Sequence, residues 1–170
     1  MNSDTLTRWL EAFGDLRERW SLRKATLPIW DRMTSACLTA AGLLISAGGA
    51  TTAKTGSADV YLIANGVLVK VAASTTLPAL TGINASAGYF VIAAFFVDSA
   101  GTVTVAGGVQ GATLGAAQFP QFPTGKALLG FLIITYASAF TGGTTPLDTA
   151  TTIYVSSTEA FDPYCLIGTL

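Results

Sequence analysis

The 170-residue sequence contains no histidine and only two cysteines. Without histidine the chain has no Ser-His-Asp or Cys-His apparatus, and it lacks the usual general base and the commonest metal ligand. Cys37 and Cys165 lie far apart and have no histidine partners, so no zinc-binding spacing exists. We expect both to be buried small apolar residues rather than a disulfide. The sequence therefore predicts no enzyme, no small-molecule substrate, no cofactor and no metal site.

Charge is also scarce. Charged residues make up 11% of the chain, against about 25% in typical soluble domains, while hydrophobic residues make up 51%. The net charge of −1 gives no basic surface for nucleic acid, so we expect no nucleic-acid partner. The most apolar N-terminal tract, residues 36–50, is interrupted by polar residues and glycines and is a poor membrane span. We expect no membrane partner and no secretory signal peptide, but a surface that favours association with other protein.

The few charges are unevenly distributed along the chain. Residues 1–32 hold six of the nine basic residues and five of the ten acidic ones, which leaves eight charges for the other 138 residues. Such a change in composition marks a boundary. We therefore predict a charged N-terminal arm over 1–32 and a nearly uncharged body over 33–170.

The arm has the pattern of an amphipathic helix. Ser3 or Asp4 can cap it, and Pro28 ends the pattern. Its apolar residues recur at alternating spacings of three and four, which is a short heptad seam. This stripe can pack on the chain's own sheet or anchor a partner. We favour partner binding, because tryptophan is enriched at binding hot spots. The predicted partner-binding residues are Leu6, Trp9, Leu10, Phe13, Leu16 and Trp20.

The body has the pattern of short β-strands separated by turns. Asn65-Gly66 between two valine-rich runs predicts a type I′ hairpin, with Val67, Val69 and Val71 facing inward and Lys70 outward. Asp98 to Gly101 has the residues of a type I turn. We predict a mainly β fold, an antiparallel β-sandwich or jelly roll with the N-terminal α-helix as an arm. Expected strands include 37–47, 60–63, 67–71, 88–97, 102–105 and 152–155.

One stretch, FPQFPTGKALLGFLIITY at 119–136, constrains the whole body. Pro120 and Pro123 predict an extended or turning entry, and Ala127 to Tyr136 then forms an almost continuous apolar run. Such runs are typical of strands covered on both faces. Since no helix-length pattern separates the strands, we expect the second cover to be another sheet and a neighbouring chain.

The carboxylates of the body do not predict a catalytic pair. Each lies beside glycine, proline, serine or threonine, where aspartate commonly bonds its own backbone in turns. A glycosidase would need two of them converging in a cleft. We expect turn-forming roles for Asp59, Asp98, Asp148, Glu159 and Asp162.

Three segments together resemble a family. FFVDSAGTVTV at 95–105, FPQFPTGKALLGFLII at 119–134 and TGGTTPLDTATTIYV at 141–155, followed by AFDP at 160–163, resemble the capsid cement or decoration proteins of tailed bacteriophages and related head-fibre proteins. The likeness covers roughly 60–166. It implies a homotrimer on the outer capsid surface of the virion, made in the host bacterial cytoplasm. Its partner would be the major capsid protein, whose neighbouring copies it would bridge and stabilise.

Two alternatives stay open. The first is a head-fibre or tail-associated base protein, in which the arm forms a short coiled coil and a receptor-binding partner is held. The second is a carbohydrate-binding jelly-roll module that uses exposed aromatic residues such as Tyr154 or Tyr164.

Overall fold

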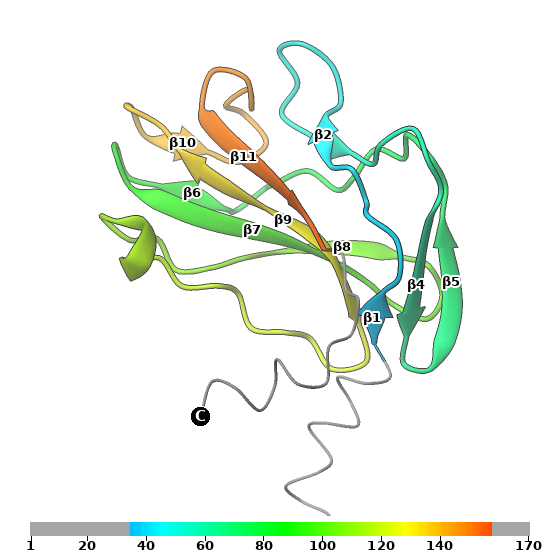
Figure 1. Ribbon diagram of the computed structural model, residues 1–170. Helices are drawn as coiled ribbons and strands as arrows, with labels where there is room; N and C mark the ends of the chain where they lie inside the picture. Colours follow the sequence, from blue (N-terminus) through cyan, green and yellow to red (C-terminus); the bar gives the residue numbers. More distant parts are fainter. Residues whose placement is uncertain (1–34, 158–170) are drawn as a thin grey trace, which may run out of the picture. The chain divides into compact units, whose positions relative to one another are not determined.

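The computed structural model describes residues 35–157, and these residues form a mainly β structure (Figure 1). All paired strands run antiparallel, and the described part of the chain contains no α-helix, only the 3₁₀ turn η1 (Leu114–Ala116). Within that part no helix is long and apolar enough to cross a membrane. The strands are β1 (Ala36–Cys37), β2 (Leu44–Ile45), β3 (Ala53–Lys54), β4 (Val60–Ala64), β5 (Val67–Val71), β6 (Asn84–Ala85), β7 (Phe90–Val97), β8 (Val103–Gly107), β9 (Ala127–Thr135), β10 (Phe140–Thr141) and β11 (Thr151–Ser156).

The mainly β prediction is confirmed. The predicted N-terminal helix and the boundary near residue 32 lie outside the described residues, so they stay predictions.

The largest sheet has the order β11-β9-β7-β8 (Figure 1). Its two central strands are the apolar runs of the sequence, β7 and β9, paired along their length with one irregularity at Phe95/Phe96. Every residue of β7 after Phe90 is buried, so this predicted central strand is covered on both faces. In β9, fully buried residues such as Leu132 and Ile134 alternate with half-buried ones such as Phe131 and Ile133. The β9 strand is therefore completely covered on one face only, and the cover on both faces that its apolar run predicts is only partial on the other face.

The second sheet has the order β1-β4-β5, and its β4–β5 pair is the predicted hairpin. Asn65 and Gly66 have φ values of 50° and 76°, the positive values that a type I′ turn requires. Val69 and Val71 are buried and Lys70 is exposed, which confirms the predicted alternation for these three positions. The inward placement of Val67 is wrong, because the residue directly follows the turn and its side chain is 47% exposed.

The first predicted strand, 37–47, is divided in two. Gly42 has a φ of 57°, a left-handed conformation that interrupts an extended strand. The residues before it form β1, which pairs with β4, and those after it form β2, which pairs with β3. One continuous strand was therefore the wrong prediction, and the turn at glycine lets this segment join two different sheets.

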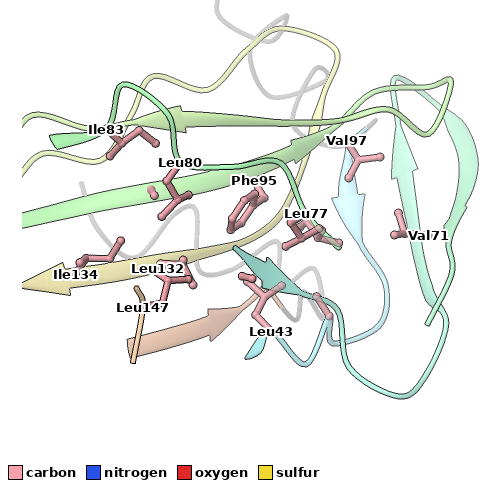
Figure 2. Packing of buried hydrophobic residues seen from close by; sticks show 14 of the residues in the cluster. Leu43, Val71, Leu77, Leu80, Ile83, Phe95, Val97, Leu132, Ile134 and Leu147 are labelled. Atoms are coloured by element: carbon pink, nitrogen blue, oxygen red, sulfur yellow. The ribbon is translucent and has the colours of Figure 1, made fainter. Parts of the chain in front are cut away.

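Side chains from the two larger sheets and from several loops form one hydrophobic cluster (Figure 2). Phe95 of β7 and Leu132 of β9 are both fully buried members of this cluster. Leu77, Leu80 and Leu147 come from segments without long strands and are also buried. These loop leucines complete the core where the strands leave it open.

A loop between β8 and β9, residues 108–126, which we call the strap, crosses the other face of the large sheet. Phe119 contacts Phe131 of β9 edge-to-face, and Phe122 contacts Phe96 of β7 in the same way. The strap therefore supplies part of the second cover of the sheet. The two phenylalanines that precede the apolar run thus fold back onto the sheet, and the neighbouring chain expected to share in the cover stays a prediction.

Candidate interaction surfaces

The residues predicted to bind a partner, Leu6, Trp9, Leu10, Phe13, Leu16 and Trp20, lie outside the described residues, as do Tyr164 and Cys165. Cys37 is buried, as expected, and its thiol donates a hydrogen bond to the Thr39 carbonyl at 3.1 Å. The described residues carry two apolar surfaces of their own.

One apolar surface lies on the β1-β4-β5 sheet. Cys37 and Leu62 are buried neighbours on its inner face, so the residues next to them, Leu38 and Tyr61, point to the outer face. Leu68 lies on that face too, since it pairs with Ile63, and its side chain is 66% exposed. We call Leu38, Tyr61 and Leu68, together with Val67 at the hairpin tip, the hairpin surface. Isolated exposed apolar residues are ordinary, but a group on one small sheet indicates an interaction site.

A second apolar surface is formed by the strap. Val109, Leu114 and Phe122 are exposed, and Phe122 is 59% exposed although its ring contacts two others. The two limbs of the strap meet where the Gln118 N–H donates to the Val109 carbonyl at 2.9 Å. Close packing there leaves no space for a side chain at Gly108, whose Cβ would meet the Gln118 carbonyl. The backbone contact thus holds the strap closed at its base and exposes its apolar side chains. Sequence reasoning missed this surface, although the length and lack of charge of 107–125 could have indicated it.

An ion pair borders the hairpin surface. Lys70 Nζ and Asp59 Oδ2 form an ion pair at 2.9 Å, and Asp59 Oδ1 accepts the Ala73 N–H at 3.0 Å. The Lys70 hydrogen bond, followed by the Ala73 N–H, lowers the pKa of Asp59, and the same pair raises the pKa of Lys70. Both groups are solvent-exposed, so water screens the pair and it is not a reactive centre. Asp59 nevertheless links the residues just before β4 to Lys70 of β5 and to Ala73 just after β5.

The other described carboxylates take the predicted turn roles. Asp98 Oδ1 accepts the N–H groups of Ala100 and Thr102, and the Gly101 N–H donates to the Asp98 carbonyl at 3.0 Å, which confirms the predicted turn. Asp148 Oδ2 accepts the Gly49 N–H at 2.7 Å. Among residues 35–157 no three histidine, cysteine or carboxylate side chains come together as a metal-binding group.

Tyr154, one of the aromatic residues expected to be exposed, is half-buried on β11 and packs against the core. Burial, and then the nearby Asp148 carboxylate, raise its pKa. Its ring is therefore a poor platform for a sugar, whereas Tyr61 and Tyr89 are exposed aromatic residues of the described chain.

Residues 35–157 thus form a mainly β, antiparallel structure that exposes large apolar side chains on two surfaces. A scan against protein-family models found no match, and searches of curated proteins and of solved structures found none either.

Proposed function

We propose that the chain is a structural virion protein: a trimeric capsid cement or decoration protein that bridges copies of the major capsid protein on the outer surface of a tailed-phage head. The observation that carries the proposal is the exposed surface of the body. Large apolar side chains are exposed on both the hairpin surface and the strap, while only six charged residues fall between 35 and 157. Such a surface suits a subunit whose neighbours bury it.

The finer fold proposed is a β-sandwich of the jelly-roll type. It is supported by the shared core, to which β4 and β5 contribute Leu62 and Val69 while β7 and β9 contribute Phe95 and Leu129. Two facing sheets with one core are the arrangement that such sandwiches have.

The proposed mechanism is mechanical. Obligate interfaces bury roughly 2,000 Å² or more and resemble a divided core. Apolar burial contributes about 25 cal/mol per Å², part of which is offset by the entropy lost on association. Moderate contacts repeated around a shell then add through multivalency and resist the pressure of packaged DNA. No catalytic group is needed for this role.

The arm is proposed to provide the attachment. In the first arrangement its seam of Leu6, Trp9, Phe13 and neighbours docks on capsid subunits. In the second it joins the three copies of the trimer. The head-fibre or tail-base alternative uses the second arrangement, because a short coiled coil is the base that such a protein needs. The carbohydrate-binding alternative has less support, since Tyr154 is half-buried.

Light scattering on the purified chain is the first test, and a trimer is expected. A monomer at all concentrations would overturn both virion proposals. Deletion of residues 1–26 should leave a trimer that no longer binds tail-less heads if the arm docks, and should give monomers if the arm joins the trimer. Trp9→Ala and Phe13→Ala should reproduce the same outcome as the deletion.

A further inference from the structure

The outer edge of strand β8 carries unpaired backbone groups. Asp98 N–H donates to Thr102 O at 3.1 Å and Gly108 N–H donates to Ile92 O at 2.8 Å, which fixes the hydrogen-bonding pattern between β7 and β8. In an antiparallel pair, residues alternate between facing the partner strand and facing away. With the observed register, Thr104 and Ala106 bond toward β7, and the N–H and C=O groups of Val103, Val105 and Gly107 point away from it.

Nothing in residues 35–157 bonds to those outward groups. The sheet ends at β8, and the strap begins to occupy this edge only beyond it, where Val109 O accepts the Gln118 N–H. Residues Val103 to Ala106 are half-exposed and Gly107 is exposed, so solvent reaches this strand. An accessible row of unpaired backbone groups is a template for another strand.

The edge also lacks the features that usually prevent pairing. Proteins protect free edges with lysine, proline, inward-pointing charge or a bulge. The β8 sequence, VTVAG, has no charge and no proline, and its pairing with β7 is regular. On the opposite hairpin, by contrast, β5 presents Lys70 beside its edge. Val103 and Val105 pack on the core but remain half-exposed, so a strand placed beside them would cover apolar surface as well.

We propose that β8 is a strand-addition surface and that its occupant is β8 of a second copy, paired antiparallel about a two-fold axis through Val105. In that arrangement Val105 faces its own equivalent, and Val103 of each copy faces Gly107 of the other. A two-fold contact of this kind requires a self-complementary strand. A short strand with small, uncharged side chains meets this requirement. The one ammonium group bound to β8, that of Lys126 on the Thr104 hydroxyl, lies on the strap face of the sheet, and Thr104 of one copy faces Ala106 of the other. The two four-stranded sheets then become one continuous sheet of eight strands.

This contact goes beyond the proposed function, because a three-fold trimer cannot be built from a two-fold contact. If the three-fold contacts of the trimer and the two-fold β8 contact are both present, two trimers pair through β8. If only the β8 contact is present, the chain is a dimer. In either case the assembly contains an even number of copies.

The test uses the full-length chain and the Val105→Pro variant, which removes the outward N–H and blocks the edge. Thr152→Pro is the matched control, because Thr152 also turns its N–H away from its partner strand, on β11 at the other edge of the same sheet, and it belongs to neither apolar surface. Native mass spectrometry should show an even-numbered assembly whose mass is halved by Val105→Pro and kept by Thr152→Pro. An assembly unchanged by Val105→Pro, or lost equally in Val105→Pro and Thr152→Pro, overturns the proposal.

Hydrogen exchange on the unmodified chain tests the same contact without relying on a variant's folding. The outward amides of Val103 and Val105 should exchange slowly in the assembled chain and at least tenfold faster after dilution to single chains. Fast exchange at all concentrations, or protection that appears only when phage heads are added, overturns the assignment of a second copy. A chain that is a trimer both with and without Val105→Pro supports the proposed function and overturns this inference, whereas a dimer that Val105→Pro converts to a monomer supports the inference and overturns the trimer.

Discussion

The ring of Phe119 meets the ring of Phe131 edge-to-face, with centroids 5.2 Å apart and planes at 84°. Phe131 belongs to β9 and Phe119 to the strap, so the contact joins a connecting loop to the sheet that it crosses. Phe119 also stacks on Phe122, whose ring contacts Phe96 of β7. Four rings thus link the strap to both central strands of the sheet.

Phe119 and Phe122 each make two ring contacts, but only Phe119 is half-buried, so Phe119→Ala should lower the free energy of unfolding by about 2 kcal/mol. The change removes a half-buried aromatic side chain and two ring contacts, and each aromatic pair contributes about 0.5–1.5 kcal/mol. Urea unfolding followed by fluorescence measures the loss. Phe122→Ala is the control and should cost about half as much, since that side chain is 59% exposed. A larger loss for Phe122→Ala than for Phe119→Ala would mean that the strap does not depend on its contact with β9.

A side chain added at Gly66 should destabilise the hairpin turn. A Cβ added there meets nothing within 4 Å, so any cost of Gly66→Ala comes from the backbone, whose φ is 76°. We expect a loss of about 1–2 kcal/mol, the cost of a left-handed conformation for an L-residue. Gly48→Ala is the matched control, because Gly48 has equally open space without a positive φ. Equal unfolding free energies for the two variants would contradict the type I′ turn.

The close packing of Gly108 against Gln118 at the base of the strap leads to a third prediction. Gly108→Ala places a Cβ against the Gln118 carbonyl, whereas Gly115→Ala at the tip meets nothing within 4 Å. We expect Gly108→Ala to separate the two limbs and to speed cleavage of the strap by a nonspecific protease at least tenfold, because local opening exposes the loop. Gly115→Ala should leave the cleavage rate unchanged. If the two variants are cut at the same rate, the contact between Gly108 and Gln118 does not close the strap.

Local patterns predicted the elements with strong sequence signals. The Asn65-Gly66 turn and the fully buried β7 strand follow from turn chemistry and from a continuous apolar run, which depend on neighbouring residues alone. The cover of the sheet could not be predicted in this way. The sequence predicts only an extended entry to the strand around Phe119 and Phe122, and the three-dimensional path of the strap places their rings against Phe131 and Phe96. Similarly, the exposure of Val67 depends on where the core ends, which alternation does not encode.

Local patterns predict the interaction surfaces only in part, for the same reason. The sequence predicts an interaction surface on the arm, because a heptad seam is a local pattern, whereas the hairpin surface, the strap and the β8 edge come from the described structure. Leu38 and Leu68 are far apart in the sequence and reach one face only through the register of β1, β4 and β5. An unpaired strand edge likewise depends on which strand ends the sheet.

The ion pair between Asp59 and Lys70 predicts how stability depends on pH. The folded state holds the pKa of Asp59 below its ordinary value of 3.8, chiefly through the Lys70 hydrogen bond. A group with a lowered pKa stabilises the folded state fully above its unfolded pKa, and this contribution is lost as the pH falls through the folded pKa. The pKa of Lys70 is raised from 10.5, so its contribution is complete below that pH and is lost in more alkaline solution.

Asp59→Asn should therefore reduce the fall in urea midpoint between about pH 5 and pH 2, because Asp59 no longer takes up a proton on acidification. Lys70→Met should have a smaller effect in the same direction, since the Ala73 N–H still bonds Asp59. Lys126→Met is the control, because Lys126 donates to the Thr104 hydroxyl and not to a carboxylate. Since the pair is exposed, 1 M salt should also weaken the effect of Lys70→Met, as expected where the Debye length is about 3 Å. An acid dependence that is the same in Asp59→Asn as in the unmodified chain would show that the pair does not link the β4–β5 hairpin to the loop at Ala73.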